Sequence, residues 1–367
     1  MKKILMGTTA IIALATFSSQ AAAAEKISLG LGGFQKAYAA KVSRATAATY
    51  MKAAAWTNTE VYVTGKTTLD NGVSVSTRIE FEADGSAGGH THRTDTAGGA
   101  TATATASGGD NATDESSLTI SSDAMGALVI GATTGAADKM AIKAPAIGPI
   151  GYGDVSGLDG VYGLTANEIG SWGDKSVKGV YLSPNFSGVS VGISYTPGEG
   201  FGGESNGKHV KHTQSNDGFQ AALKYSGEMS GAAVDVSLAH FNNNSGGVNT
   251  NAIGVNVGMN GITVGGSYND YDSKGTNVSS RDGSGYDLGV AYTSGAMSVA
   301  ATYMKSEDDG ATKGGKKDKD TMWSLGAGYD LGAGVGLVAQ YYSARKATDA
   351  NVKQSSKAIV AGIEVGF

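Results

Sequence analysis

The chain of 367 residues contains no cysteine and only four prolines. The missing cysteine excludes disulfides, thiolate metal ligands and a cysteine nucleophile. Beyond the first residues, no apolar run approaches the roughly 20 residues that a membrane helix needs. Basic residues are also in the minority, with 28 Lys and Arg against 33 Asp and Glu for a formal net charge of -5. This acidic balance argues against a nucleic-acid partner.

The N-terminal residues predict export from the cytoplasm. Lys2 and Lys3 precede an apolar stretch over residues 4–17, and "SSQAAAAE" then supplies the small residues that a signal peptidase recognises. We therefore expect a signal peptide over residues 1–24, since the apolar stretch is too short for a transmembrane anchor. The mature chain is expected to form a single domain over residues 25–367.

Apolar residues alternate with small or polar ones along most of the chain. Glycine, with 57 residues, has about twice its usual share. From about Val177 onward nearly every segment alternates with period two, which predicts strands with two different faces. In "VKGVYLSPNFSGVSVGISYTP" the alternation assigns Val180 and Leu182 to the same apolar face as the strand after the turn. The last nine residues, "IVAGIEVGF", continue it with Ile359, Ala361, Ile363, Val365 and Phe367.

The second face of these strands contains almost no large apolar side chains. It carries Ser, Gly, Asn, Thr and Ala instead, whereas a soluble β-sandwich would pack large apolar groups between its sheets. Such a face suits water, so we predict an all-β transmembrane antiparallel barrel with a lipid-facing outside and a wet lumen. Five charged residues are expected to face that lumen: Glu80, Lys224, Asp235, Asp287 and Glu364.

Counting the alternating segments gives about 16 strands, five before residue 135 and eleven after it. An even number is typical of single-chain bacterial outer-membrane barrels. Tight turns such as "LDNG", "MNG" and "LGAG" alternate with long polar connections, as short periplasmic turns alternate with external loops. The long connections are expected at residues 35–58, 84–115, 134–176, 197–217, 242–250, 270–284, 305–320 and 343–355.

Two early stretches depart from the strand pattern. "FQKAYAAKVSRATAATYMKAAAW" is alanine-rich with helix-like spacing, so it is expected to be the first external loop with a helical turn. The polar, low-complexity run that contains His90 and His92 is expected to be a second loop with a solvated histidine pair and no metal site.

Tyrosines near the strand ends share the outward phase, as an aromatic girdle at the membrane interfaces would. They are Tyr195, Tyr225, Tyr268, Tyr292, Tyr303 and Tyr329. An enzyme is not expected, because a barrel enzyme needs a nucleophile or carboxylate paired with a base. His240 has the outward phase and is a poor candidate for that base.

The sequence resembles the trimeric sixteen-stranded general porins of Gram-negative bacteria, especially the alphaproteobacterial type. The resemblance rests on the signal peptide, on "GVYLSPNFSGVSVGISY", on the "GxxY" strand endings and on the C-terminal "IVAGIEVGF". It covers the chain from about residue 177 to the end, together with "VYVTGKTTLDNGVSVSTRIEFEA". It implies a homotrimer in the outer membrane, in contact with outer-membrane lipid and lipopolysaccharide. Phe367 is expected to serve as a C-terminal assembly signal.

The resemblance also implies a constriction loop folded into the lumen between strands five and six, at about residues 134–176. Its candidate acids are Asp154, Asp159 and Glu168. The facing basic wall is expected to carry three residues, Lys66 and Arg78 from strands two and three and Arg44 from the first loop. Crossed acidic and basic groups would produce a transverse field that orients dipolar solutes.

These features together predict a water-filled channel for passive diffusion of ions and small hydrophilic solutes, without a cofactor or bound metal. The net negative charge predicts a mild cation preference. One alternative is a solute-specific outer-membrane channel with a dedicated binding site. Another is a structural or adhesive barrel whose external loops contact a host or the peptidoglycan.

Overall fold

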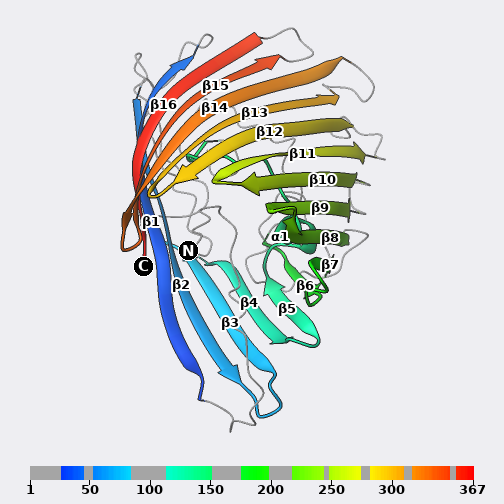
Figure 1. Cartoon of the computed structure of the whole chain (residues 1–367). Helices are drawn as coiled ribbons and strands as arrows, with labels where there is room; N and C mark the ends of the chain where they lie inside the picture. Colours follow the sequence, from blue (N-terminus) through cyan, green and yellow to red (C-terminus); the bar gives the residue numbers. More distant parts are fainter. Residues whose placement is uncertain are drawn as a thin grey trace, which may run out of the picture.

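The computed structural model describes residues 26–44, 53–83, 113–150, 175–197, 217–243, 248–273, 282–309, 316–347 and 353–367. These residues form a closed antiparallel barrel of sixteen strands with one short helix, α1 (Figure 1). No helix among the residues described is long and apolar enough to cross a membrane. The predicted signal peptide lies outside the described residues.

The elements follow one another around the barrel in chain order. They are β1 (Ser28–Arg44), β2 (Ala53–Thr68), β3 (Ser74–Glu82), β4 (Thr113–Ser122), β5 (Gly126–Ala132), α1 (Ala136–Met140), β6 (Val177–Leu182), β7 (Val189–Thr196), β8 (Gly218–Met229), β9 (Ala232–Asn243), β10 (Val248–Met259), β11 (Ile262–Ser273), β12 (Gly283–Ser294), β13 (Met297–Asp309), β14 (Lys317–Gly332), β15 (Val335–Ala347) and β16 (Lys353–Gly366).

The first and last strands close the barrel. β1 pairs with β16 from Phe34 opposite Gly366 to Arg44 opposite Ser356. Gly33 and Phe367 then exchange two backbone hydrogen bonds of 2.9 and 3.1 Å. Closure matters because lipid offers no partner for an open strand edge. The predicted fold class and the division into five strands before residue 135 and eleven after it are confirmed.

Tight turns join the even strands to the odd ones, as predicted. Between β10 and β11, Asn260 and Gly261 have φ angles of 52° and 82°. Between β8 and β9, Ser230 and Gly231 have φ angles of 51° and 82°. Two successive positive φ angles suit the twist of a two-residue hairpin and favour Asn and Gly.

Large apolar side chains cover the outer face of the barrel. Ile359 is 60% exposed and Leu288 is 57% exposed, as expected of side chains that lie against lipid rather than within a core. The predicted tyrosines share this face: Tyr195, Tyr268, Tyr292, Tyr303 and Tyr329 are exposed and Tyr225 is half-buried. Trp323 packs beside Tyr341 on the same face, with 5.0 Å between ring centroids.

The described residues of the alanine-rich stretch form strands and not a loop, so the prediction was wrong for them. β1 runs to Arg44 and β2 begins at Ala53, whereas residues 45–52 lie outside the described part of the chain. Ala39 pairs with Ala55, and Tyr38 pairs with Trp56. Alanine is compatible with a helix or a strand, so the backbone pairing of β1 with β16 and β2 decides the conformation. Later strands also extend into the predicted loops, as β13 does to Asp309 and β14 from Lys317.

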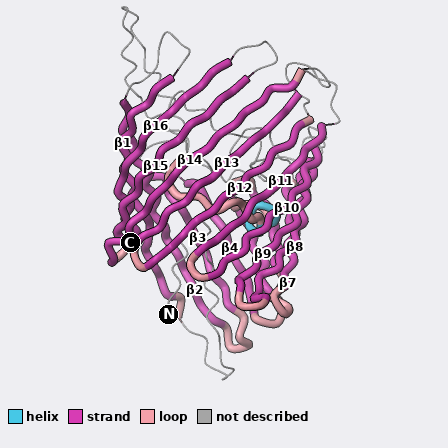
Figure 2. Tube along the Cα trace, turned by 45° about the horizontal axis from the view of Figure 1, so that its top comes forward, coloured by secondary structure: helices cyan, strands magenta, loops and turns pink. Residues whose placement is uncertain are grey.

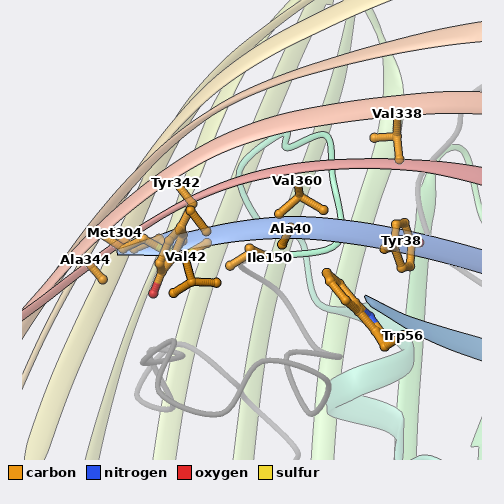
Figure 3. Packing of buried hydrophobic residues seen from close by; sticks show 12 residues of the cluster. Tyr38, Ala40, Val42, Trp56, Ile150, Met304, Val338, Tyr342, Ala344 and Val360 are labelled. Carbon is orange, nitrogen blue, oxygen red and sulfur yellow. The ribbon is translucent and has the colours of Figure 1, made fainter. Parts of the chain in front are cut away.

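The expectation of an inner face almost free of large apolar groups was also wrong. One cluster on β1, β2 and β13–β16 contains inward-facing residues that are at most 9% exposed (Figure 3). They include Tyr38, Val42, Trp56, Met304, Met322, Tyr342 and Val360. Ile150, which arrives from the β5–β6 connection, lies among them. Apolar groups are stable inside a wet barrel where another segment covers them.

Val180 and Leu182 likewise face inward and not toward lipid. Val180 lies opposite Ser194 and Leu182 opposite Gly192, both of which are inner residues. Val180 is buried and belongs to a cluster that contains Ala136 of α1. Six residues separate β6 from β7, and their number decides which residues of β6 share a face with Val189 and Val191 of β7. A shift of one residue moves every side chain of a strand to the other face.

Candidate functional site

The connection between β5 and β6 enters the lumen. Residues 133–150, hereafter the inner segment, contain α1 followed by an extended stretch, and Figure 2 shows α1 inside the ring of strands. Gly135 provides no side-chain cap for the helix. The wall of the barrel supplies acceptors instead, because Ala136 N–H donates to Ser194 Oγ at 3.0 Å and Ala137 N–H to Gln220 Oε1 at 2.9 Å.

The extended stretch then crosses the wall strand by strand. Ile142 N–H donates to Ser237 Oγ of β9 at 3.0 Å. Ala144 N–H donates to Asp287 Oδ1 of β12 at 2.8 Å. Inward side chains from separate strands thus hold the backbone of the inner segment. Further contacts are Asn256 Nδ2 to Lys143 O at 3.1 Å, Thr302 Oγ1 to Pro145 O at 2.9 Å, Ile150 N–H to Gln340 Oε1 at 2.9 Å and Gln340 Nε2 to Ile150 O at 2.7 Å.

A buried lysine ties the two ends of the connection together. Lys178 of β6 is 2% exposed. Its ammonium donates to Thr133 O at 2.6 Å and to Ser176 O at 3.0 Å. Thr133 follows β5 directly and Ser176 precedes β6 directly. The Lys178 ammonium therefore holds the two points at which the connection leaves and rejoins the wall.

The wall formed by β2, β3 and β4 carries a network of charges. Arg78 forms an ion pair with Glu80 and lies over the Tyr62 ring, 3.9 Å from its centroid. Tyr62 donates to Glu60 Oε2 at 2.9 Å. Lys175, just before β6, lies 2.9 Å from Asp114. Arg78 and Lys175 are therefore the basic groups that pair with the carboxylates of this wall.

Carboxylates predominate on this wall. Oxygens of Glu60, Glu82 and Asp114 all lie within 4.8 Å of one another. Glu115 accepts hydrogen bonds from Ser117 at 3.0 Å and from Thr133 at 2.8 Å. Glu80 pairs with Arg78, and Lys175 lies 3.8 Å from Glu80, so acids outnumber bases in the described part of this wall. An excess of carboxylates favours a negative potential close to them.

The inner segment contributes mainly basic groups. Lys139 Nζ donates to Thr133 Oγ1 at 3.0 Å, and Lys143 lies at the start of the extended stretch. Burial raises the pKa of the Asp138 carboxyl in α1, while the nearby Lys143 and Lys139 oppose the rise. Lysines of the inner segment and acids of the β2–β4 wall together provide charges of both signs in the lumen.

The predicted basic residues are not brought together. Lys66 has the inward phase but lies near the tight-turn end of β2, opposite Ser28 and Ser76. Arg44 lies at the other end of β1 and belongs to a strand, not to the first loop. Arg78 also has the inward phase and is paired with Glu80. Their joint role at a constriction stays a prediction.

The five residues predicted to face the lumen all have the inward phase in the strand register. Glu364 accepts from the Tyr38 hydroxyl at 2.8 Å, and Asp235 accepts from Ser226 at 2.6 Å. Asp287 is 0% exposed because the inner segment covers it. The predicted loop acids Asp154, Asp159 and Glu168 lie outside the described residues.

Sequence reasoning missed Lys178, Gln220 and Gln340. The only available signal was their inward phase, which they share with residues that line the lumen. Phe367 is 63% exposed, and its backbone closes the barrel at Gly33. Its role as an assembly signal stays a prediction.

A family model described as Gram-negative porin matches residues 8–349. The chain belongs to the Gram-negative porin family. Comparison of this porin with curated protein sequences finds no match. This porin lies in the outer membrane, where its barrel forms a channel for passive diffusion. Porins are typically channels without enzymatic activity.

Solved structures show the same fold at low sequence identity. A loop L8 deletion mutant of OmpT from Vibrio cholerae is 12% identical, with 94% of this chain and 100% of that chain covered at a TM-score of 0.63. An anion-selective porin from Comamonas acidovorans is 15% identical, with 93% of this chain and 100% of that chain covered at a TM-score of 0.60. The outer membrane channel DcaP of Acinetobacter baumannii is 12% identical, with 96% of this chain and 100% of that chain covered at a TM-score of 0.61.

Proposed function

We propose that this porin admits ions and small hydrophilic solutes with a mild preference for cations. The observation that carries this proposal is the excess of carboxylates on the β2–β4 wall over its basic groups, Arg78, Lys175 and Lys66. Acidic side chains that line a pore favour cations because they replace part of the electrostatic stabilisation that water gives the ion. The lysines of the inner segment moderate the preference.

The predicted loop acids belong to the same proposal. Asp154, Asp159 and Glu168 follow the inner segment in the β5–β6 connection, which supports a place for them at the constriction. Lys66, Arg78 and Arg44 are proposed as the basic groups of the pore. Outer-membrane lipid and lipopolysaccharide are proposed to contact the exposed apolar and tyrosine side chains of the outer face.

Neutralising the acidic wall tests the cation preference. In the triple variant Glu60→Gln, Glu82→Gln, Asp114→Asn, the cation-to-anion permeability ratio is expected to fall by roughly twofold, since three nearby charges disappear. The measurement is the reversal potential of single channels in a planar bilayer under a salt gradient.

Asp123→Asn is the matched control for that experiment, because Asp123 is exposed in the turn between β4 and β5. An unchanged reversal potential in the triple variant would contradict the proposed source of selectivity. Current blockage by a solute at low concentration would favour a solute-specific channel. A folded barrel that never conducts would favour the adhesive alternative.

We also propose that this porin is a homotrimer, as the resemblance implies. The support is the outer face around β1, where Ala39 lies between Ala55 of β2 and Ala361 of β16, and all three are exposed. Small side chains let two backbones approach closely, whereas many other lipid-facing positions carry Leu, Ile and Tyr. A closed symmetric assembly would use this face of each subunit.

A bulky residue on this face tests the trimer. We expect Ala39→Trp to shift the purified protein from trimer to monomer, since an indole prevents close approach of two barrels. Ala221→Trp is the matched control, because Ala221 lies on the outer face of β8, opposite Ile193 and His240 and across the ring of strands from β1. Mass measurement by light scattering in detergent distinguishes the states. Equal masses for the two variants would place the interface elsewhere.

A further inference from the structure

Three inward-facing glycines lie directly beneath the backbone of the inner segment. A Cβ atom built on Gly254 of β10 would lie 2.0 Å from Ile142 O. One on Gly289 of β12 would lie 2.5 Å from Pro145 O, and one on Gly326 of β14 would lie 2.0 Å from Ile147 O. Ordinary contact begins at 3.4 Å, so a side chain fits at these three positions only if the inner segment moves.

None of these glycines is required by backbone conformation. Their φ angles lie outside the positive range in which glycine is favoured, unlike those of Gly261 and Gly231 in the tight turns. Glycine in a strand interior weakens the strand unless another backbone approaches closely. The close approach of the inner segment is therefore the physical reason for glycine at positions 254, 289 and 326.

Each of these glycines lies directly across from a residue that hydrogen-bonds the inner segment. Gly254 pairs with Ser237, which accepts from Ile142 N–H. Gly289 pairs with Thr302, which donates to Pro145 O. The third pair is Gly326 with Gln340, which both accepts from and donates to the backbone of Ile150.

We propose that these three glycine–polar pairs set how far the inner segment stands from the wall, and thereby the width of the channel. In each pair the glycine leaves space for a carbonyl, and the polar partner anchors the backbone beside it. Because the pairs occur on β9–β10, β12–β13 and β14–β15, they fix the inner segment at three separate points. This inference rests on the proposed pore function for its effect on conductance.

A single methyl group should displace the inner segment. In Gly254→Ala, the Ile142 carbonyl must retreat by about 1.4 Å, which is 3.4 minus 2.0 Å. The retreat is directed into the lumen, since the wall lies on the other side. Single-channel conductance is expected to fall by roughly a third, because the displaced segment occupies part of the water-filled path. Gly258→Ala is the matched control, because Gly258 lies on the inner face of the same strand and its Cβ would meet nothing closer than 3.4 Å.

A second measurement does not depend on conduction. The chain contains no cysteine, so Ala239→Cys places one thiol beneath the inner segment, in the buried cluster that contains Ala137 and Met140 of α1. We expect this thiol to react slowly with a water-soluble maleimide. Adding Gly254→Ala should accelerate the reaction by roughly tenfold, because the displaced segment uncovers the thiol more often. Adding Gly258→Ala should leave the rate unchanged.

The outcomes separate the inference from the pore function. If Gly254→Ala keeps both the wild-type conductance and the slow labelling rate, the proposal is overturned. If the wild type does not conduct but the labelling pattern holds, the pore function fails and the positioning role survives. Gln340→Asn is made in parallel because it adds no atoms to the wall and its shorter side chain cannot reach both Ile150 groups. A folded Gln340→Asn barrel with wild-type conductance and open-channel noise would contradict the proposal even if Gly254→Ala did not fold.

Discussion

Replacing Asp287 with alanine is expected to lower the free energy of unfolding of the barrel by about 3 kcal/mol. A hydrogen bond to a buried charged acceptor contributes about 1.5–3 kcal/mol, and removal of the acceptor also leaves its donors unsatisfied. The Asp287 carboxylate accepts from Ala144 N–H at 2.8 Å and from Ser267 N–H at 2.7 Å. It also accepts from Ser267 Oγ at 2.5 Å. The substitution therefore loosens both the inner segment and β11.

Urea unfolding in lipid vesicles, followed by tryptophan fluorescence, measures this loss. Asp235→Ala is the matched control, because Asp235 also faces the lumen but is half-buried and makes its contact with Ser226 of the neighbouring strand. We expect the control to cost less than about 1 kcal/mol, as is usual for one partly solvated hydrogen bond. Equal losses in the two variants would mean that Asp287 does not anchor the inner segment.

Period-two alternation was sufficient to predict the barrel, because a strand with lipid on one side and water on the other must alternate. The same rule failed where the inner face is covered. Val180 and Tyr342 are apolar or aromatic residues in the inward phase, and alternation cannot distinguish a lipid contact from a contact with α1 or Ile150. The phase across the turn after Leu182 depends on the number of turn residues, which composition does not reveal.

The candidate site was less predictable for a different reason. Ser194, Ser237, Asp287, Thr302 and Gln340 hold one short segment, yet they come from strands far apart in the sequence. No spacing rule connects such residues. Each is an ordinary polar residue of the inner face until the register and the path of the inner segment are known. The prediction for the alanine-rich stretch failed similarly, because only the pairing among β16, β1 and β2 shows that its described residues form strands.

Lys178→Met is expected to lower the free energy of unfolding by about 2–4 kcal/mol and to loosen the β5–β6 connection. Methionine fills a similar volume but donates no hydrogen bond, so the buried carbonyls of Thr133 and Ser176 lose the Lys178 donor. Each unsatisfied buried group costs about 1–3 kcal/mol. Methionine also avoids the desolvation penalty of the buried ammonium, which offsets part of the lost stability.

Unfolding in urea and open-channel current noise together test the role of Lys178. We expect more noise in Lys178→Met, because the two ends of the connection are no longer held at the wall and the inner segment between them gains freedom. Lys224→Met is the matched control, since Lys224 faces the lumen from β8 and is half-buried. Higher stability in Lys178→Met than in the wild type would show that burial of the ammonium costs more than its two hydrogen bonds return. In that case the β5–β6 connection would be held by the contacts between the inner segment and the wall, from Ser194 to Gln340, and not by the hydrogen bonds of Lys178.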